Sequence, residues 1–183
     1  EALFQSAFHV TSIITTTGLS SCDFNLWPSF SKMILFLLMI VGASAGSTGG
    51  GFKVSRLVVL VKSAKNEIQK VIHPRSIKKL HMDGRAFPED LIRSILVYCG
   101  IYVLLSFGSI LIVSLDNFSF ETNVSAVMAT LNNIGPGLDV VGPTGNFSAF
   151  SDVSKVVMIF DMLAGRLELI PILVLFSPQT WKK

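Results

Sequence analysis

The feature that most restricts the fold of this chain is a mostly apolar run without charge over residues 94–113. These twenty residues include no charged side chain. A helix of that length, at about 1.5 Å per residue, spans the ~30 Å hydrocarbon layer of a bilayer. Residues 31–61 and 153–176 are also largely apolar, although the first stretch has a glycine-rich middle and the second carries charges. We therefore expect three membrane segments and an all-α polytopic membrane protein.

The few charged residues are unevenly distributed. They make up 15% of the chain, against about 25% in soluble domains. Ten of the fifteen Lys and Arg side chains lie within residues 53–93: Lys53, Arg56, Lys62, Lys65, Lys70, Arg75, Lys78, Lys79, Arg85 and Arg93. The positive-inside rule then predicts that residues 53–93 and the C-terminus, with Lys182 and Lys183, are cytoplasmic. A nucleic-acid site is the other use of a basic patch, and its position between membrane spans argues against it.

The chain contains an internal repeat. Residues 6–19 (SAFHVTSIITTTGL) align without gaps to residues 125–138 (SAVMATLNNIGPGL), at an offset of 119. Residues 31–42 align to residues 154–165 at an offset of 123, which puts Gly42 opposite Gly165. The difference of four residues falls in the intervening loop, where insertions are tolerated. Each unit is predicted to be a short helix, a polar Gly/Thr loop and a spanning helix.

The short helices, about residues 2–15 and 121–132, are too short to cross a bilayer. They must enter and leave on the outer face, because the helices after them run inward to the basic side. Non-helical backbone at membrane depth is tolerated where it is buried or lines a water-filled path. Both units therefore predict a pore loop.

The first pore loop contains Thr15, Thr16, Thr17 and Gly18. Consecutive Thr residues before Gly can present a column of backbone carbonyls, with Gly supplying the positive φ that turns them inward. Such carbonyls replace the hydration shell of a cation. A Thr-rich turn that only caps a helix is the structural alternative, and the paired loop at residues 132–137 (NNIGPG) argues against it.

Residues 42–51 (GASAGSTGGG) interrupt a stretch where a spanning helix should continue. Five of the ten are Gly, each costing about 1 kcal/mol relative to Ala in a helix, so we expect the helix to break. Close helix packing by small residues is an alternative. A phosphate-binding loop is excluded, because Gly51 is followed by Phe52 and Lys53 instead of Lys and Ser or Thr.

Arg166 is a charged residue at membrane depth, where such side chains normally face a cavity or a partner. An internal ion pair with Asp161 or Glu168 is the structural alternative. Those residues stand at i−5 and i+2, which are poor spacings for contact on one helix. Neither the two Cys nor the three His show a metal-ligand spacing, and we find no nucleophile–base pair or paired carboxylates that would indicate an enzyme.

These motifs together resemble the Trk/Ktr/HKT superfamily of K⁺ transporters, and its bacterial Trk branch in particular. The matches are TTTGLS (residues 15–20), GASAGSTGGGFKVSR (42–56), HPR (73–75), NNIGPGL (132–138) and AGRLEL (164–169). Members carry four helix–pore loop–helix repeats in one chain. The resemblance implies that residues 1–183 are the third and fourth repeats, that the N-terminal half lies elsewhere, and that the activity is K⁺ uptake through a carbonyl filter.

The resemblance also assigns the site residues. Thr15, Thr16, Thr17 and Gly18 form the filter of repeat three. In repeat four, the aligned Gly-Leu steps indicate Gly137, whereas an Asn-x-Gly filter indicates Asn133, Ile134 and Gly135, which we favour because Pro136 fixes φ directly afterwards. The implied gate is an intramembrane loop that obstructs the pore, together with a cationic barrier at Arg166. Its residues are Gly42, Ala43, Ser44, Ala45, Gly46, Ser47, Thr48, Gly49, Gly50 and Gly51.

The expected organisation has three parts: residues 1–66 (pore helix, filter and broken inner helix of repeat three), 67–89 (a cytoplasmic basic connector) and 90–183 (repeat four). The resemblance implies a homodimer of full chains in the cell inner membrane, surrounded by lipid, and a cytosolic nucleotide-binding regulatory subunit. This chain itself is expected to need no cofactor and to bind no nucleic acid. The alternative function is a secondary transporter with a coupled cation or proton site at Arg166 and Asp161.

Overall fold

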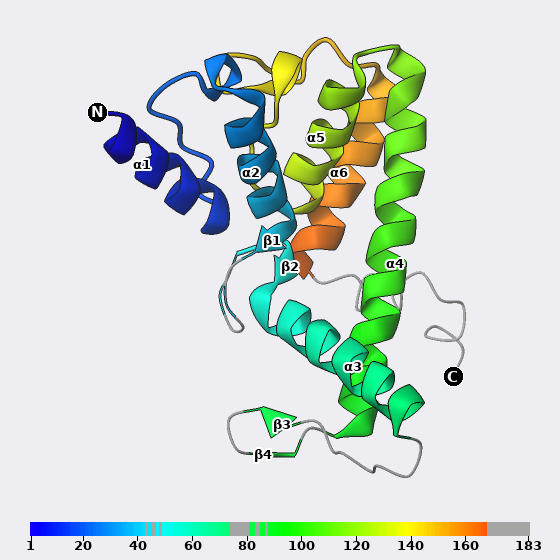
Figure 1. The fold of residues 1–183 in the computed structure, drawn as a ribbon. Coiled ribbons are helices and arrows are strands. Elements are labelled where there is room, and N and C mark those ends of the chain that lie inside the picture. Colours follow the sequence, from blue (N-terminus) through cyan, green and yellow to red (C-terminus); the bar gives the residue numbers. More distant parts are fainter. Residues whose placement is uncertain are drawn as a thin grey trace.

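The computed structural model describes residues 1–42, 44, 47, 49–73, 81–82, 85–86 and 88–167. It is built almost entirely of helices (Figure 1). The helices are α1 (Ala2–Ile14), α2 (Ser29–Ile40), α3 (Val54–Ile72), α4 (Glu89–Val113), α5 (Phe120–Leu131) and α6 (Asp152–Leu167), with short 3₁₀ turns η1 (Phe24–Leu26), η2 (Ser114–Asp116) and η3 (Asp139–Val141).

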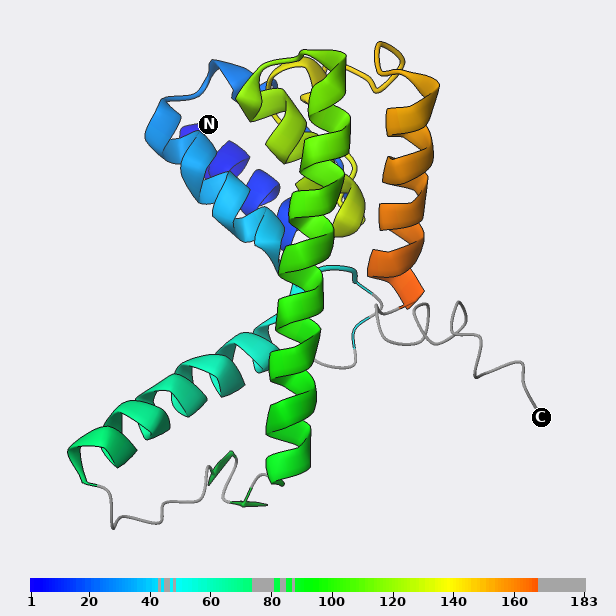
Figure 2. The same ribbon diagram turned by 90° about the vertical axis from the view of Figure 1, so that its right-hand side faces the viewer.

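A short helix lies at the centre of the fold. α5 packs against both α4 and α6, while α1 packs against α2. From Thr122 to Leu131 every residue of α5 except Val124 is buried, including the polar Asn123 and Ser125. η1 and η3 lie at one end of the bundle, and α3 projects sideways from the other end (Figures 1 and 2). The basic helix is therefore at the opposite end of the bundle from η1 and η3.

The two units repeat in the structure, with a correction to the sequence alignment. α1 ends at Ile14 and α5 at Leu131, an offset of 117. α2 begins at Ser29 and α6 at Asp152, an offset of 123. The first offset was expected to be 119, which is wrong by two residues, because Thr15 and Asn132 begin the same series of backbone hydrogen bonds. Matches of Ser and Ala in the sequence are weaker markers of register. The loop therefore differs by six residues instead of four.

α4 is the one helix, among the residues that the structure describes, long and apolar enough to cross a membrane. One face of α4 packs inward through Tyr98, Tyr102 and Ser109, while Leu104 and Leu111 are exposed on the other face. α2 ends at Ile40, where the glycine-rich segment begins, and so is shorter than a complete span. α6 is described as far as Leu167, and residues 168–176 of the third expected segment lie outside the described residues.

The expectation of an all-α chain fails in one detail that matters for the site. Strands β1 (Val41–Gly42) and β2 (Phe52–Lys53) pair in parallel, with Val41 opposite Phe52 and Gly42 opposite Lys53. This bridge forms because the absent Cβ of Gly42 lets the chain return close to it: a Cβ there would lie 2.4 Å from the Gly50 carbonyl oxygen. The two ends of the glycine-rich segment are therefore tied together.

A second short pair, β3 (His81–Met82) and β4 (Arg85–Ala86), is antiparallel and lies between α3 and α4. α3 itself continues to Ile72, so the helix extends into the region expected to be the connector from residue 67 onward.

Candidate functional site

The first predicted filter loop begins where α1 ends. The amides of Thr15, Thr16 and Thr17 donate to carbonyls four, three and five residues earlier, at 3.0, 3.1 and 2.9 Å. Thr16 has a φ of 54° and Gly18 a φ of 72°. Left-handed residues alternate here with ordinary ones, so the carbonyl directions differ from those of a continuing helix or strand.

The second loop has the same backbone design. The amides of Asn132, Asn133 and Ile134 donate to carbonyls four, three and five residues earlier, at 3.1, 3.0 and 2.9 Å. Asn133 has a φ of 54° and Gly135 a φ of 113°. Gly135 therefore takes the place that Gly18 has in the first loop. Gly137 does not: its amide donates to the Val141 carbonyl at 2.7 Å.

The two loops lie directly against each other. A Cβ on Gly18 would stand 2.0 Å from the Ile134 carbonyl oxygen, and a Cβ on Gly135 would stand 3.9 Å from the Gly18 Cα. Thr15 and Thr17 are exposed in this chain and share a hydrogen bond between their hydroxyls at 2.9 Å. The structure thus brings together the filter residues predicted in both repeats.

The glycine-rich segment packs beneath the second loop. A Cβ on Gly50 would lie 2.4 Å from the Asn132 carbonyl oxygen, and Gly51, with a φ of 84°, approaches the Asn132 side chain. Of the predicted gate residues, the structure describes Gly42, Ser44, Ser47 and Gly49 to Gly51. Four others lie outside the described residues: Ala43, Ala45, Gly46 and Thr48.

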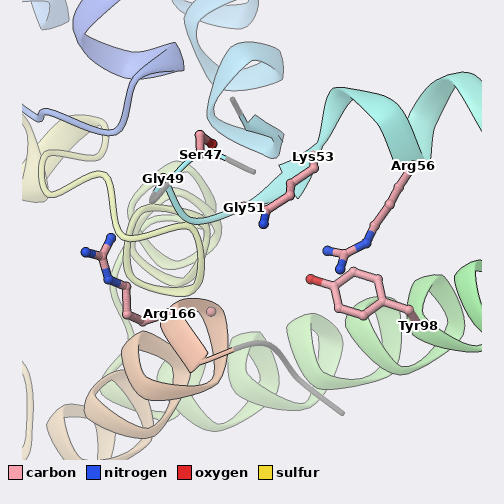
Figure 3. Close-up of a pocket in the computed structure, with 8 residues that line it drawn as sticks. Ser47, Gly49, Gly51, Lys53, Arg56, Tyr98 and Arg166 are labelled. Atoms are coloured by element: carbon pink, nitrogen blue, oxygen red, sulfur yellow. The ribbon is translucent and has the colours of Figure 1, made fainter. Parts of the chain in front are cut away.

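Arg166 borders a cavity of about 230 Å³ together with this segment (Figure 3). Lys53 and Arg56 line the same cavity from β2 and α3, so three cationic side chains surround it. The Arg56 guanidinium lies over the Tyr98 ring, 4.0 Å from its centroid. Gly165 fixes the position of Arg166, because a Cβ there would be 1.7 Å from the Leu131 carbonyl oxygen, so α6 is in direct contact with the end of α5.

The structure does not bring Arg166 and Asp161 together. The Asp161 carboxylate is fully buried and accepts a hydrogen bond from the Ser109 hydroxyl of α4 at 2.8 Å. Five residues of α-helix correspond to about 500°, so the two side chains leave α6 about 140° apart. Glu168, the other candidate partner of Arg166, lies outside the described residues.

The sequence reasoning missed Asn132, which connects the filter loop to its surroundings. Asn132 is fully buried and accepts a hydrogen bond from the Tyr102 hydroxyl at 3.0 Å, while its amide group donates to the Met128 carbonyl at 2.9 Å. Tyr102 lies thirty residues away on α4. The available signal was Asn132 itself, an amide side chain at the position equivalent to Thr15, which needs a partner when buried.

In the described part of the chain, no group of three or more His, Cys, Asp or Glu residues is arranged to hold a metal ion.

Comparison with known proteins decides the family. The model of the TrkH family, described as cation transport protein, matches residues 1–183. The chain belongs to the TrkH family. Its relatives include the Trk system potassium uptake protein TrkH of Salmonella typhimurium, 37% identical over 181 residues, and TrkI of Halomonas elongata, 32% identical over 183 residues. This confirms the resemblance read from the motifs.

A solved TrkH structure has the same fold. The crystal structure of the potassium transporter TrkH from Vibrio parahaemolyticus matches 99% of this chain with a TM-score of 0.88 and 34% identity. The match covers 38% of that chain, and this chain spans 37% of the length of its Salmonella and Halomonas relatives. These TrkH-family relatives are named as potassium uptake proteins.

Proposed function

We propose that this chain supplies two of the four pore repeats of a K⁺ uptake channel in the cell inner membrane. The observation that carries the proposal is the pair of loops at residues 15–18 and 132–135. Each follows a short helix, each has the same hydrogen-bond pattern and left-handed residues, and the two are in contact. A carbonyl filter is a ring of backbone carbonyls, and loops from several repeats must meet to form it.

In this proposal the ion binds to backbone carbonyls of both loops. Repeat three contributes Thr15, Thr16, Thr17 and Gly18. Repeat four contributes Asn133, Ile134 and Gly135, because Gly135 has the backbone position of Gly18. The C-terminal ends of α1 and α5 both lead into these loops, and their dipoles add negative potential where a cation sits.

We further propose that the glycine-rich loop over residues 42–51 and Arg166 form the gate. The loop packs against the filter loop of repeat four, and it borders a cavity that three cationic side chains surround. Positive charge in a poorly screened space repels K⁺. Movement of this loop away from the pore would widen the ion path and also change the positions of the cationic side chains around the cavity.

The rest of the assembly follows from the same proposal. The N-terminal half completes the pore, and full chains form a homodimer surrounded by membrane lipid. The basic residues of α3, such as Lys62 and Lys65, face the cytoplasm and offer a docking surface to a cytosolic nucleotide-binding regulatory subunit. The secondary-transporter alternative is weaker, because Asp161 is directed toward Ser109 and away from Arg166.

The test is single-channel recording and flux from the complete protein in vesicles. Ohmic unitary currents with reversal potentials that favour K⁺ over Na⁺ are expected. Arg166→Ala, and separately a deletion within residues 44–49, should raise basal K⁺ flux without the regulatory subunit. Saturable flux without unitary currents would overturn the channel proposal, and unchanged or reduced flux in both folded variants would overturn the gate assignment.

A further inference from the structure

The loops that return from the two filters are joined at the outer end of the molecule, at a site that no sequence motif marks. We infer that Asn25, with Asp139 and Gly142, forms a brace that holds the two filter loops at a fixed separation and so sets ion selectivity. Asn25 belongs to repeat three, and Asp139 and Gly142 belong to repeat four. The inference rests on the proposed function, and Asn25 is a positioning residue because it does not line the ion path.

Asn25 makes a two-point contact with the backbone of Asp139. The Asp139 amide donates to the Asn25 Oδ1 at 2.9 Å, and the Asn25 Nδ2 donates to the Asp139 carbonyl at 3.0 Å. Two antiparallel bonds from a planar amide fix orientation as well as distance, which a single bond cannot do. They join residues that are 114 positions apart in the chain.

Asp139 is itself held in place. Its carboxylate accepts hydrogen bonds at 2.5 and 2.7 Å from the hydroxyls of Ser119, which caps α5, and Thr122, in the first turn of α5. Its φ of 58° is unusual for a non-glycine residue, and Asp is one of the few that adopt it at low cost. The start of the pore helix, the return loop of repeat four and Asn25 of repeat three thus form one connected unit.

Gly142 closes this unit: its amide donates to the Asp139 carbonyl at 3.0 Å, the same carbonyl that accepts from Asn25. A Cβ on Gly142 would stand 2.1 Å from the Asn25 Nδ2 and 2.9 Å from its Cγ. The backbone of Gly142 has a φ of −66°, which any residue can adopt. Glycine is therefore required here only because the Asn25 amide occupies the space, and an alanine would displace that amide while leaving its chemistry unchanged.

The brace is close enough to act on the filter. Asp139 follows Gly135 by four residues, and Asn25 follows Gly18 by seven. Leu138 lies between Gly135 and Asp139. Its amide donates to the Ser125 hydroxyl at 2.9 Å, and its side chain is buried in one cluster with Ile134. A displacement of Asp139 therefore shifts Leu138, which packs against Ile134, whose carbonyl faces the filter of repeat three.

The experiment compares Asn25→Ala and Gly142→Ala, each in the complete protein in planar bilayers, with K⁺ on one side and Na⁺ on the other. Each variant should lower the K⁺/Na⁺ permeability ratio at least tenfold, a shift of about 59 mV in reversal potential. The double variant should lower it no further, because both changes remove the same contact.

Two control variants separate the brace from general effects. Gly108→Ala is a matched glycine substitution on α4, where nothing lies within 4 Å of the added Cβ. Lys32→Met removes another contact between the repeats near the outer end, the 3.1 Å ion pair with Glu121, without touching a return loop. Both should keep the wild-type ratio.

Wild-type permeability ratios in Asn25→Ala and Gly142→Ala would overturn the brace, and so would additive losses in the double variant. If Asn25→Ala does not assemble, Gly142→Ala decides alone, since only the end of one side chain has to move. A wild-type protein that shows no K⁺-selective current would contradict the proposed function and not the brace specifically.

Discussion

Replacement of Gly18 by Ser tests the filter most directly, because two separate costs can be read from the structure. At a φ of 72° a non-glycine residue pays about 1–2 kcal/mol in the left-handed region. The new Cβ would also lie 2.0 Å from the Ile134 carbonyl oxygen, whereas ordinary contact begins at 3.4 Å. The Ile134 carbonyl must therefore move about 1.4 Å away from the new Cβ of residue 18 to restore ordinary contact.

A displacement of that size is large compared with the tolerance of a carbonyl site for a dehydrated ion. We expect Gly18→Ser to lower the K⁺/Na⁺ permeability ratio at least tenfold, or about 59 mV in reversal potential under bi-ionic conditions. Gly135→Ala is the matched comparison: its φ of 113° imposes strain, but its Cβ would meet nothing closer than 3.9 Å. Its loss should be smaller. Equal selectivity in wild type and Gly18→Ser, with normal conductance, would remove Gly18 from the filter.

Three further outcomes are expected. Neutralising basic residues of α3 (Lys62, Lys65 and Lys70 to Gln) should weaken binding of the regulatory subunit in pull-down assays. The loss should be largest at low salt, because exposed charges act over a Debye length of about 10 Å. An affinity that stays the same in all these variants would refute the docking surface. Tyr102→Phe leaves the buried Asn132 Oδ1 without its hydrogen-bond donor and should lower the free energy of unfolding by about 1 kcal/mol. Denaturation in detergent measures this difference. An unchanged free energy of unfolding would show that the hydrogen bond contributes nothing to stability. The hydroxyls of Ser119 and then Thr122 hold the pKa of Asp139 below its ordinary value of 3.8. The folded state therefore has this contribution in full above the ordinary pKa and loses it as the pH falls through the lowered pKa. Thermal unfolding should show the loss below pH 3.8, and Asp139→Asn should lack this part of the pH dependence.

The sequence was sufficient for the elements whose cause is local. The twenty apolar residues from 94 to 113 predicted the greater part of α4, and the five glycines from 42 to 51 predicted that a helix would end near residue 42. The lengths of α1 and α5 were predicted to within a residue or two, since polar residues follow each of them directly. These features depend on hydrophobicity and backbone freedom, which a sequence records position by position.

Features that depend on contact between distant segments could not be predicted in the same way. Nothing near Asn132 in the sequence indicates that a tyrosine of α4 would reach its side chain. The β1–β2 bridge was missed because two-residue strands have no periodicity to detect. The repeat was aligned at an offset of 119 because identical side chains were counted, whereas the structure aligns Gly18 with Gly135, the filter glycine that the Asn-x-Gly pattern had favoured.

The difference between α2 and α6 has a consequence for how such a pore can evolve. The two helices start at equivalent residues, yet the first ends at Ile40 and the second continues through Gly165 and Arg166. In an assembly of identical subunits, a substitution that breaks a helix appears in every copy at once, because symmetry repeats it. Duplicated units on a single polypeptide mutate one at a time. One unit can then acquire a break and its neighbour a charge, each chosen separately by selection.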